Sequence, residues 1–143
     1  MPEVPANIQE FNTIAGLIFA QLYEAFPIVV NIDNSRIAKA IGVEGEWSKH
    51  ELTSGRSFGE VLAYTTSWLA AEEYTRWAGG HPAERVTLTS KGLAALNAVP
   101  SGLKQSVGNE LKNATARGSL DLSKIGDLIG GVIGGFTRSM ASG

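Results

Sequence analysis

The side chains best suited to acid–base or metal chemistry are few in this sequence. Its two histidines are His50 and His81, and their separation matches no short metal-binding motif such as His-x-x-x-His. Glu72 and Glu73 are adjacent, and neighbouring helix positions point in different directions, which does not suit a general acid and base. The chain has no cysteine, so thiol catalysis and thiolate metal sites are excluded. We therefore expect no enzyme activity, no metal site and no cofactor.

Glycines recur with a helical spacing near the end of the sequence. Gly126, Gly130 and Gly134 occupy every fourth position, and Gly131 and Gly135 form a second row. A phosphate-binding loop needs Lys and then Ser or Thr after its glycines, and this segment lacks them. Along a helix such rows instead leave a flat groove on which another backbone packs closely. The apolar contacts predicted around this groove include Ile129, Ile133 and Phe136.

This glycine-rich helix is too costly to persist by itself in water. Each glycine costs about 0.8–1.0 kcal/mol relative to alanine, or about 4–5 kcal/mol for five, so the helix needs a partner surface. Three partners remain open, namely another copy of the segment, a small-residue helix face in the same chain, or a membrane interface. The apolar stretch 125–136 contains Asp127 and is shorter than the ~20 residues of a membrane span, so membrane contact would be peripheral. The alternative to all three is that the segment is a flexible terminus without a role.

The first elements of the chain have clear local signals. Asn7 followed by Glu10 has the pattern of a capping box, and apolar residues then recur at steps of three and four. We expect this first helix to stop near Phe26, because Pro27 disfavours helical backbone in the residue before it. The β-rich run over 28–32 predicts a short strand.

A second and a third helix are expected further along. Gly42 should end a short helix over 36–41, and 43–56 is then expected to be an inserted polar loop. Ser57 and Glu60 form a second capping-box candidate that opens a longer helix. The core-facing positions predicted for that helix are Phe58, Val61, Leu62, Thr65, Trp68 and Leu69.

The next segments predict a hairpin and two more helices. Aromatic or β-branched residues at 74–77 and 85–88 flank a turn-rich stretch, which indicates a two-stranded hairpin. Thr89 is an N-cap candidate for a helix over 90–99. A weak helix is expected around 103–116.

Two segments in this order of elements carry a resemblance. Residues 67–74, SWLAAEEY, and 86–96, VTLTSKGLAAL, resemble the third helix, wing and following helix of bacterial winged-helix regulators of the MarR and PadR kind. Those families share a Leu-Thr-x-x-Gly-x-x-x-Leu motif after the wing, matched here from Leu88 to Leu96. The resemblance covers roughly residues 7–99. It implies a mainly α fold with a small β-hairpin wing, a winged helix-turn-helix whose third helix reads DNA.

The side chains of the third helix favour contact with protein over contact with DNA. DNA readers use cations and amides to meet phosphates and base edges. The positions predicted to face outward are Gly59, Glu60, Ala63, Ser67, Ala70 and Ala71, and none carries a cation or an amide. Ala63, Ser67 and Ala71 form a row of small residues that lets another helix approach closely. An ordinary solvated face with alanines as good helix formers is the alternative.

A DNA-binding regulator remains the second hypothesis. Its contacts would lie at the start of the third helix and on the wing, and the candidates are Lys49, Arg56, Arg76, His81 and Arg85. The alternative is that these are scattered surface charges.

The charge balance argues against strong binding to nucleic acid. Residues 1–100 carry a net charge of −4 and residues 101–143 carry +2, so the basic footprint of a nucleic-acid binder is missing from the larger part. We expect a winged-helix-like domain over 1–100 and a linker with a glycine-rich association segment over 101–143. The predicted function is a non-catalytic binding module, a homo-oligomer or the partner of another protein, with no small-molecule ligand implied. The first residues lack a secretory pattern, and we expect a cytoplasmic protein.

Overall fold

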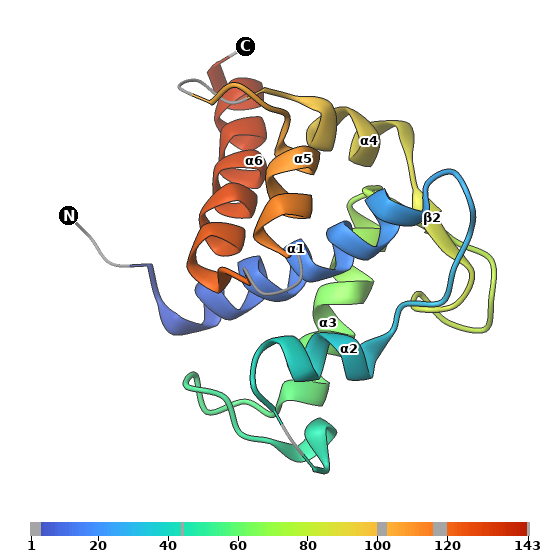
Figure 1. Ribbon diagram of the computed structural model, residues 1–143, viewed down its shortest axis with the longest axis vertical. Helices are drawn as coiled ribbons and strands as arrows, with labels where there is room; N and C mark the ends of the chain where they lie inside the picture. Colours follow the sequence, from blue (N-terminus) through green and yellow to red (C-terminus); the bar gives the residue numbers. More distant parts are fainter. Residues whose placement is uncertain (1–3, 44, 100–102, 116–119, 143) are drawn as a thin grey trace.

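Six α-helices, one 3-10 helix and a two-stranded hairpin make up the part of the chain that the computed structural model describes, residues 4–43, 45–99, 103–115 and 120–142. From residue 134 onward only the helical backbone is described. The elements are α1 (Ala6–Ala25), α2 (Asn34–Ala40), η1 (Trp47–Lys49), α3 (Phe58–Ala71), β1 (Thr75–Trp77), β2 (Val86–Leu88), α4 (Ser90–Asn97), α5 (Val107–Ala114) and α6 (Leu122–Ser142) (Figure 1). The expected mainly helical chain with one small hairpin is confirmed.

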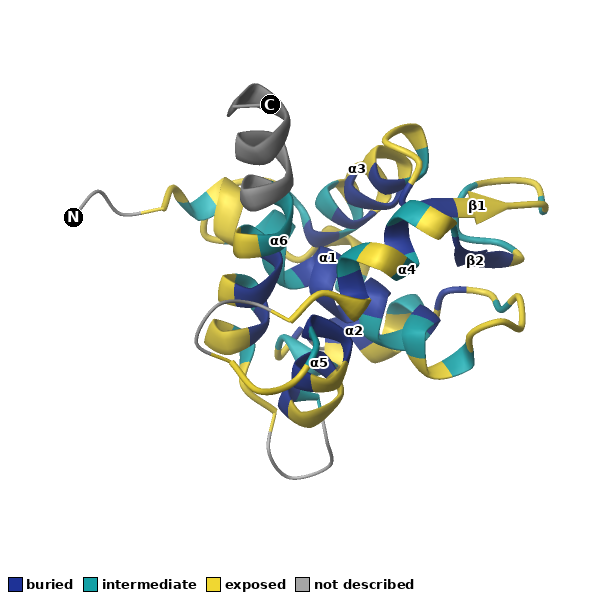
Figure 2. Cartoon of the chain, turned by 90° about the horizontal axis from the view of Figure 1, so that it is seen from above, coloured by how far each residue is buried: buried dark blue, intermediate teal, exposed yellow. Residues whose placement is uncertain are grey.

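Helix α1 is the central element, in contact with α3, α5, α6 and β2. Every residue from Ile14 to Phe19 is buried, which is typical of a helix covered on all sides, and Figure 2 shows this stretch in the interior. The helix ends at Ala25, close to the predicted stop. The predicted capping box is wrong, because α1 begins at Ala6 with Pro5 as an N-cap that makes no side-chain bond. The Glu10 carboxylate instead accepts the backbone N–H of Ser54 at 2.9 Å.

The strand predicted over 28–32 is reduced to one bridging residue. Val30 pairs antiparallel with Val86 of β2, and the Ile32 N–H donates to the carbonyl oxygen of Ala83. Ile28 and Val29 are 66% and 44% exposed. Their β propensity finds no packing partner, and propensity alone does not form a strand.

The short helix and the loop follow the sequence signals. Asp33 caps α2 by accepting the N–H of Arg36, and Gly42 follows the helix with a φ of +83°, a conformation that favours glycine. The 43–56 connection is irregular apart from η1. Within η1, the Trp47 ring packs edge-on against Phe58 at 5.6 Å between ring centroids, which fixes the loop on the start of α3.

Helix α3 begins as predicted but is rotated about its axis. Ser57 caps it by accepting the N–H of Glu60. Phe58, Leu62, Thr65 and Leu69 are buried as expected, together with Thr66. Trp68, predicted in the core, is 37% exposed. Thr66 can be buried because its hydroxyl donates to the carbonyl oxygen of Leu62, which satisfies the polar group.

The hairpin has the predicted strands in a shorter form. Thr75, Arg76 and Trp77 of β1 pair antiparallel with Leu88, Thr87 and Val86 of β2. All three residues of β2 are buried, whereas β1 exposes its last two. The hairpin therefore covers the core with β2, whereas Arg76 and Trp77 of β1 are exposed to solvent, and the two strands differ in burial in the same way in Figure 2.

The last helices join the same core. Helix α4 ends at Asn97, two residues before the predicted end, and Thr89 caps it as expected. The weak helix predicted over 103–116 is α5, capped by Ser106. Leu111 of α5 and Ile125 of α6 belong to one hydrophobic cluster with α1. The core is therefore continuous across the boundary expected near residue 100.

Candidate functional site

The exposed face of α3 forms a ridge of small and aromatic side chains. This ridge, the α3 ridge below, consists of Ala63, Tyr64, Ser67, Trp68 and Ala71, all exposed. Tyr64 is 73% exposed, and residues three or four apart on a helix lie side by side. The predicted small-residue row lies on the surface, and the rotation of α3 adds two aromatic side chains to it.

A hollow of about 520 Å³ borders one side of the α3 ridge. Ala63 and Ser67 line it together with Trp47, Pro82 and His81. These residues come from α3, η1 and the hairpin turn, so the inserted loop and the turn line the same hollow as the small-residue row.

An apolar groove of about 680 Å³ borders the other side of the ridge. Tyr64 and Trp68 line it from α3, and Ile8 and Phe11 line it from α1. The Phe11 ring meets Trp68 edge-on at 5.0 Å between ring centroids. Ile8 is 43% exposed, so the groove presents apolar surface on both of its walls.

Sequence periodicity missed the aromatic part of this site. The pattern predicted Trp68 in the core and did not include Tyr64 among the outward positions, because it cannot show that the hydroxyl of Thr66 is satisfied inside the helix. The exposure of two large aromatic residues four positions apart is the signal that could have found the groove, since aromatic side chains are enriched at protein interfaces.

Three of the predicted DNA contacts lie beside carboxylates. The nitrogen–oxygen distances are 3.5 Å for Lys49 and Glu46, 3.4 Å for Arg56 and Glu60, and 2.7 Å for His81 and Glu84. These exposed pairs contribute little to stability, but each carboxylate reduces the positive potential that a phosphate would meet.

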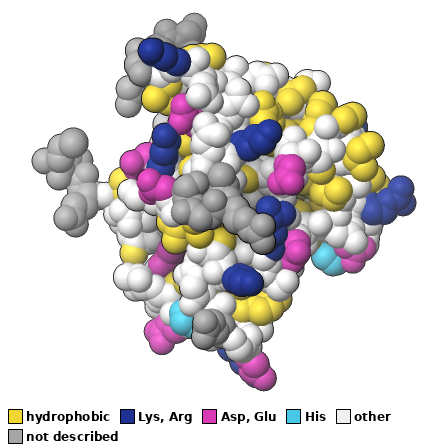
Figure 3. Space-filling model, viewed as in Figure 1, with side chains coloured by type: hydrophobic (Ala, Val, Ile, Leu, Met, Phe, Trp, Pro, Cys, Tyr) yellow, Lys and Arg dark blue, Asp and Glu magenta, His cyan; other side chains and the backbone are white. Residues whose placement is uncertain are grey.

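The two remaining candidates lie on the hairpin. Arg76 in β1 and Arg85 just before β2 are exposed, and neither forms an ion pair within the described part of the chain. On the face shown in Figure 3, Lys and Arg side chains alternate with Asp and Glu and form no continuous basic strip.

The glycine row of α6 faces α1 of the same chain. A Cβ atom built on Gly126 would lie 3.3 Å from Thr13 Oγ1, and one on Gly130 would lie 3.2 Å from Asn12 Nδ2. Gly16 of α1 provides the closest approach, because a Cβ there would overlap Ile125 Cγ2. The partner surface that the glycine-rich helix required is therefore found on α1, and not on the small-residue row of α3.

The other predicted interface residues of this segment differ in accessibility. Ile129 is fully buried within the chain, so it does not present a surface to another molecule in this fold. Ile133 is partly buried against the core. The surroundings of Gly134 and Phe136 lie outside the described residues.

Two further observations bear on the classes of function. Among the described residues, no three His, Asp or Glu side chains gather as they would around a metal ion. No helix in the described ranges is long and apolar enough to span a membrane. Searches against protein-family models, curated proteins and solved structures found nothing that matches this chain.

Proposed function

We propose that this chain is a non-catalytic binding module that contacts other protein surfaces through the α3 ridge. The observation that carries the proposal is the chemistry of that ridge, where aromatic and small side chains lie between two hollows and none of the five ridge residues is a cation or an amide. Tyr and Trp supply large contact areas at low entropic cost and often form the centre of protein interfaces. Proteins that bind phosphates and base edges instead use mainly cations and amides at the contact surface.

A winged-helix arrangement is part of this proposal. The order of elements supports it, because a helix is followed by a bridging segment, two helices, a hairpin and a further helix. The antiparallel bridge between Val30 and Val86 puts the 28–32 segment beside β2, as the third strand of a wing sheet would lie. The 17-residue connection from Ile41 to Ser57 lengthens the usual turn, and its Trp47 then lines the hollow beside the ridge.

The first experiment asks whether the chain binds duplex DNA. We expect no binding of a mixed-sequence duplex at low salt by fluorescence polarisation, since the ridge offers no cation for counterion release. Submicromolar affinity that weakens steeply with added salt would contradict the proposal.

The second experiment asks whether the ridge contacts protein. Ser67→Arg introduces a long cation between the two hollows, and Asn109→Arg puts the same charge on the exposed surface of α5. Self-association is the first case to measure, by sedimentation over a range of concentrations. We expect Ser67→Arg to weaken association at least ten-fold and Asn109→Arg to leave it unchanged.

If the chain is monomeric, proteins captured from cells by wild type and by Asn109→Arg should be lost with Ser67→Arg. Equal behaviour of the two variants would refute a role for the ridge.

A second candidate function rests on Arg76 and Arg85. Their guanidinium groups lie on the exposed side of the hairpin without carboxylate partners among the described residues, and the wing can contact the DNA backbone in winged-helix proteins. Should DNA binding be observed, replacing both arginines by alanine is expected to reduce the affinity uniformly across sequences and to lower the salt dependence.

A further inference from the structure

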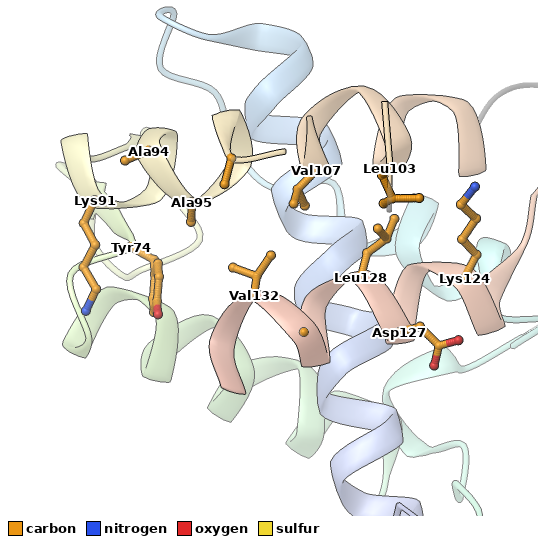
Figure 4. A pocket seen from close by; sticks show the side chains of 12 residues that line it. Tyr74, Lys91, Ala94, Ala95, Leu103, Val107, Lys124, Asp127, Leu128 and Val132 are labelled. Carbon is orange, nitrogen blue, oxygen red and sulfur yellow. The ribbon is translucent and has the colours of Figure 1, made fainter. Parts of the chain in front are cut away.

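An apolar cavity of about 750 Å³ lies between α4, α5 and α6, away from the α3 ridge. Its walls are formed by Ala94 and Ala98 from the α4 region, Leu103 and Val107 around the start of α5, and Leu128 and Val132 from α6 (Figure 4). Cavities of 300–1,000 Å³ with apolar walls and a few polar groups are typical of small-molecule sites. The small side chains on α4 leave the space open, because a larger residue at either alanine would project into it.

One end of the cavity is formed by a tyrosine that is almost fully covered. Tyr74 lines this end and is only 3% exposed. Its ring is held by stacking on Trp68, with 6.1 Å between centroids, and by an edge contact with Phe19 at 5.9 Å. Among the described residues, none donates a hydrogen bond to the Tyr74 hydroxyl or accepts one from it. The described buried polar atoms that lack a partner do not include this oxygen, so the hydroxyl is accessible from the cavity.

A positive charge lies at the same end. The Lys91 ammonium is 4.4 Å from the centroid of the Tyr74 ring, and it also donates to the carbonyl oxygen of Glu72 at 2.8 Å. Burial, followed by the nearby Glu72 carboxylate, raises the pKa of Tyr74 above its ordinary value of 10.0. The hydroxyl is therefore a proton donor at neutral pH.

The opposite end of the cavity disfavours an anionic group. Lys124 is paired with Glu110 at 2.8 Å, and Asp127 lies beside it on the rim (Figure 4). No ion pair of Asp127 is found in the part of the chain that the structure describes. A ligand with one anionic group would avoid this end and would place that group beside Tyr74 and Lys91.

We propose that this cavity binds an amphiphilic monocarboxylate, with its carboxylate accepting a hydrogen bond from the Tyr74 hydroxyl beside the Lys91 ammonium and its alkyl chain lying along the walls of α4, α5 and α6. The alkyl chain gains the free energy of apolar burial. The carboxylate gains a charge-assisted hydrogen bond and the attraction of a nearby cation. No residue of the α3 ridge lines this cavity, although Trp68 of the ridge supports the Tyr74 ring, and the proposal does not rest on the function proposed for the ridge.

The test compares ligands that differ only in the charged group. Calorimetric titrations of the full chain at pH 8 would use decanoate and decylammonium, each below its micelle concentration. We expect decanoate to bind at least ten-fold more tightly, because the donor and the cation at the Tyr74 end favour an anion. Equal affinity, tighter binding of decylammonium, or no binding of decanoate up to 1 mM, about −4 kcal/mol, would overturn the proposal.

Two variants assign the binding to this cavity. Tyr74→Phe keeps the ring contacts and removes the hydroxyl, and we expect decanoate to bind about ten-fold more weakly. Val132→Arg should block the cavity, whereas Leu120→Arg, on an exposed position outside it, should not. Circular dichroism checks that each variant is folded. Unchanged affinity in folded Tyr74→Phe would refute the role of the hydroxyl, and unchanged binding in Ser67→Arg shows that the site does not depend on the α3 ridge.

Discussion

Asp33 shows how one side chain can hold a helix in position. Its Oδ1 atom accepts the backbone N–H of Arg36 at 3.0 Å and the hydroxyl of Ser35 at 2.8 Å. Its own backbone N–H donates to Gln21 Oε1 of α1 at 2.9 Å, and its carbonyl oxygen accepts from Gln21 Nε2 at 3.1 Å. Asp33 therefore caps α2 and joins it to the central helix.

Replacing this cap should reduce stability by a predictable amount. We expect Asp33→Ala to lower the free energy of unfolding by about 1 kcal/mol, measured by urea denaturation at pH 7. Asp33→Asn is the matched control, because asparagine is an equally good N-cap. A loss in the asparagine variant as large as that in the alanine variant would show that the cap is not the cause.

The same cap gives a dependence on pH. The hydrogen bond from the Ser35 hydroxyl, and then that from the Arg36 backbone, hold the pKa of Asp33 below its ordinary value of 3.8. The ionised cap therefore stabilises the fold above pH 3.8, and this contribution is lost as the pH falls through the lower pKa of the folded state. The stability difference between wild type and Asp33→Ala should shrink in that window, by a small amount because the group is exposed.

At the scale of elements, the packing of α6 on α1 depends on one glycine. Ile125 and Ile129 of α6 are fully buried, and Gly16 leaves the space that their side chains occupy. Gly131, on the same helix as the two isoleucines, has nothing within 4 Å of the position where a Cβ would lie. The two glycines therefore have different roles, although both lie within helices.

Substituting alanine at each position tests this difference. Gly16→Ala should destabilise the chain, because overpacking a buried contact costs about 1–3 kcal/mol and both neighbouring side chains are branched and enclosed. Gly131→Ala should stabilise it by about 0.8–1.0 kcal/mol, the difference in helix propensity. Thermal unfolding of the two variants beside wild type measures both changes, and a stabilised Gly16→Ala would disprove the close contact.

At the scale of the whole molecule, one hydrophobic core includes residues from both halves of the sequence. Ile125, Leu128 and Ile129 of α6 pack in the same cluster as Ile14 and Phe19 of α1. Each such side chain contributes about 1.5–3 kcal/mol when fully buried. Together they are comparable with the entire stability of an average domain, about 5–15 kcal/mol.

Removal of residues 119–143 should therefore unfold or strongly destabilise the rest. We expect the shortened chain to lose its cooperative thermal transition and its amide protection in α1, measured by circular dichroism and hydrogen exchange. The association role that the sequence predicted for the glycine-rich segment implies instead that this truncation lowers the oligomeric state, which light scattering would report. A shortened chain that keeps the native transition would contradict the role assigned here to α6, and identical masses would contradict the association role.

Local signals were enough to predict most elements. Ser57 and Thr89 mark helix starts through their side-chain oxygens, Gly42 marks an end, and the turn-rich stretch between β1 and β2 marks the hairpin. Each of these signals acts between residues close in sequence, so it can be read without the tertiary structure. The small-residue row of the α3 ridge was also found in this way.

Only the tertiary structure decided what each apolar surface packs against. The 3.6-residue period shows that a helix has an apolar face, but it does not show whether Trp68 or Thr66 lies inside it, nor that the glycine-rich helix packs on Gly16. The cavity between α4, α5 and α6 depends on Tyr74 and Val132, which are far apart in the chain. Close approach and enclosed space depend on the shapes of two distant segments at once, and a periodic pattern records only one segment at a time.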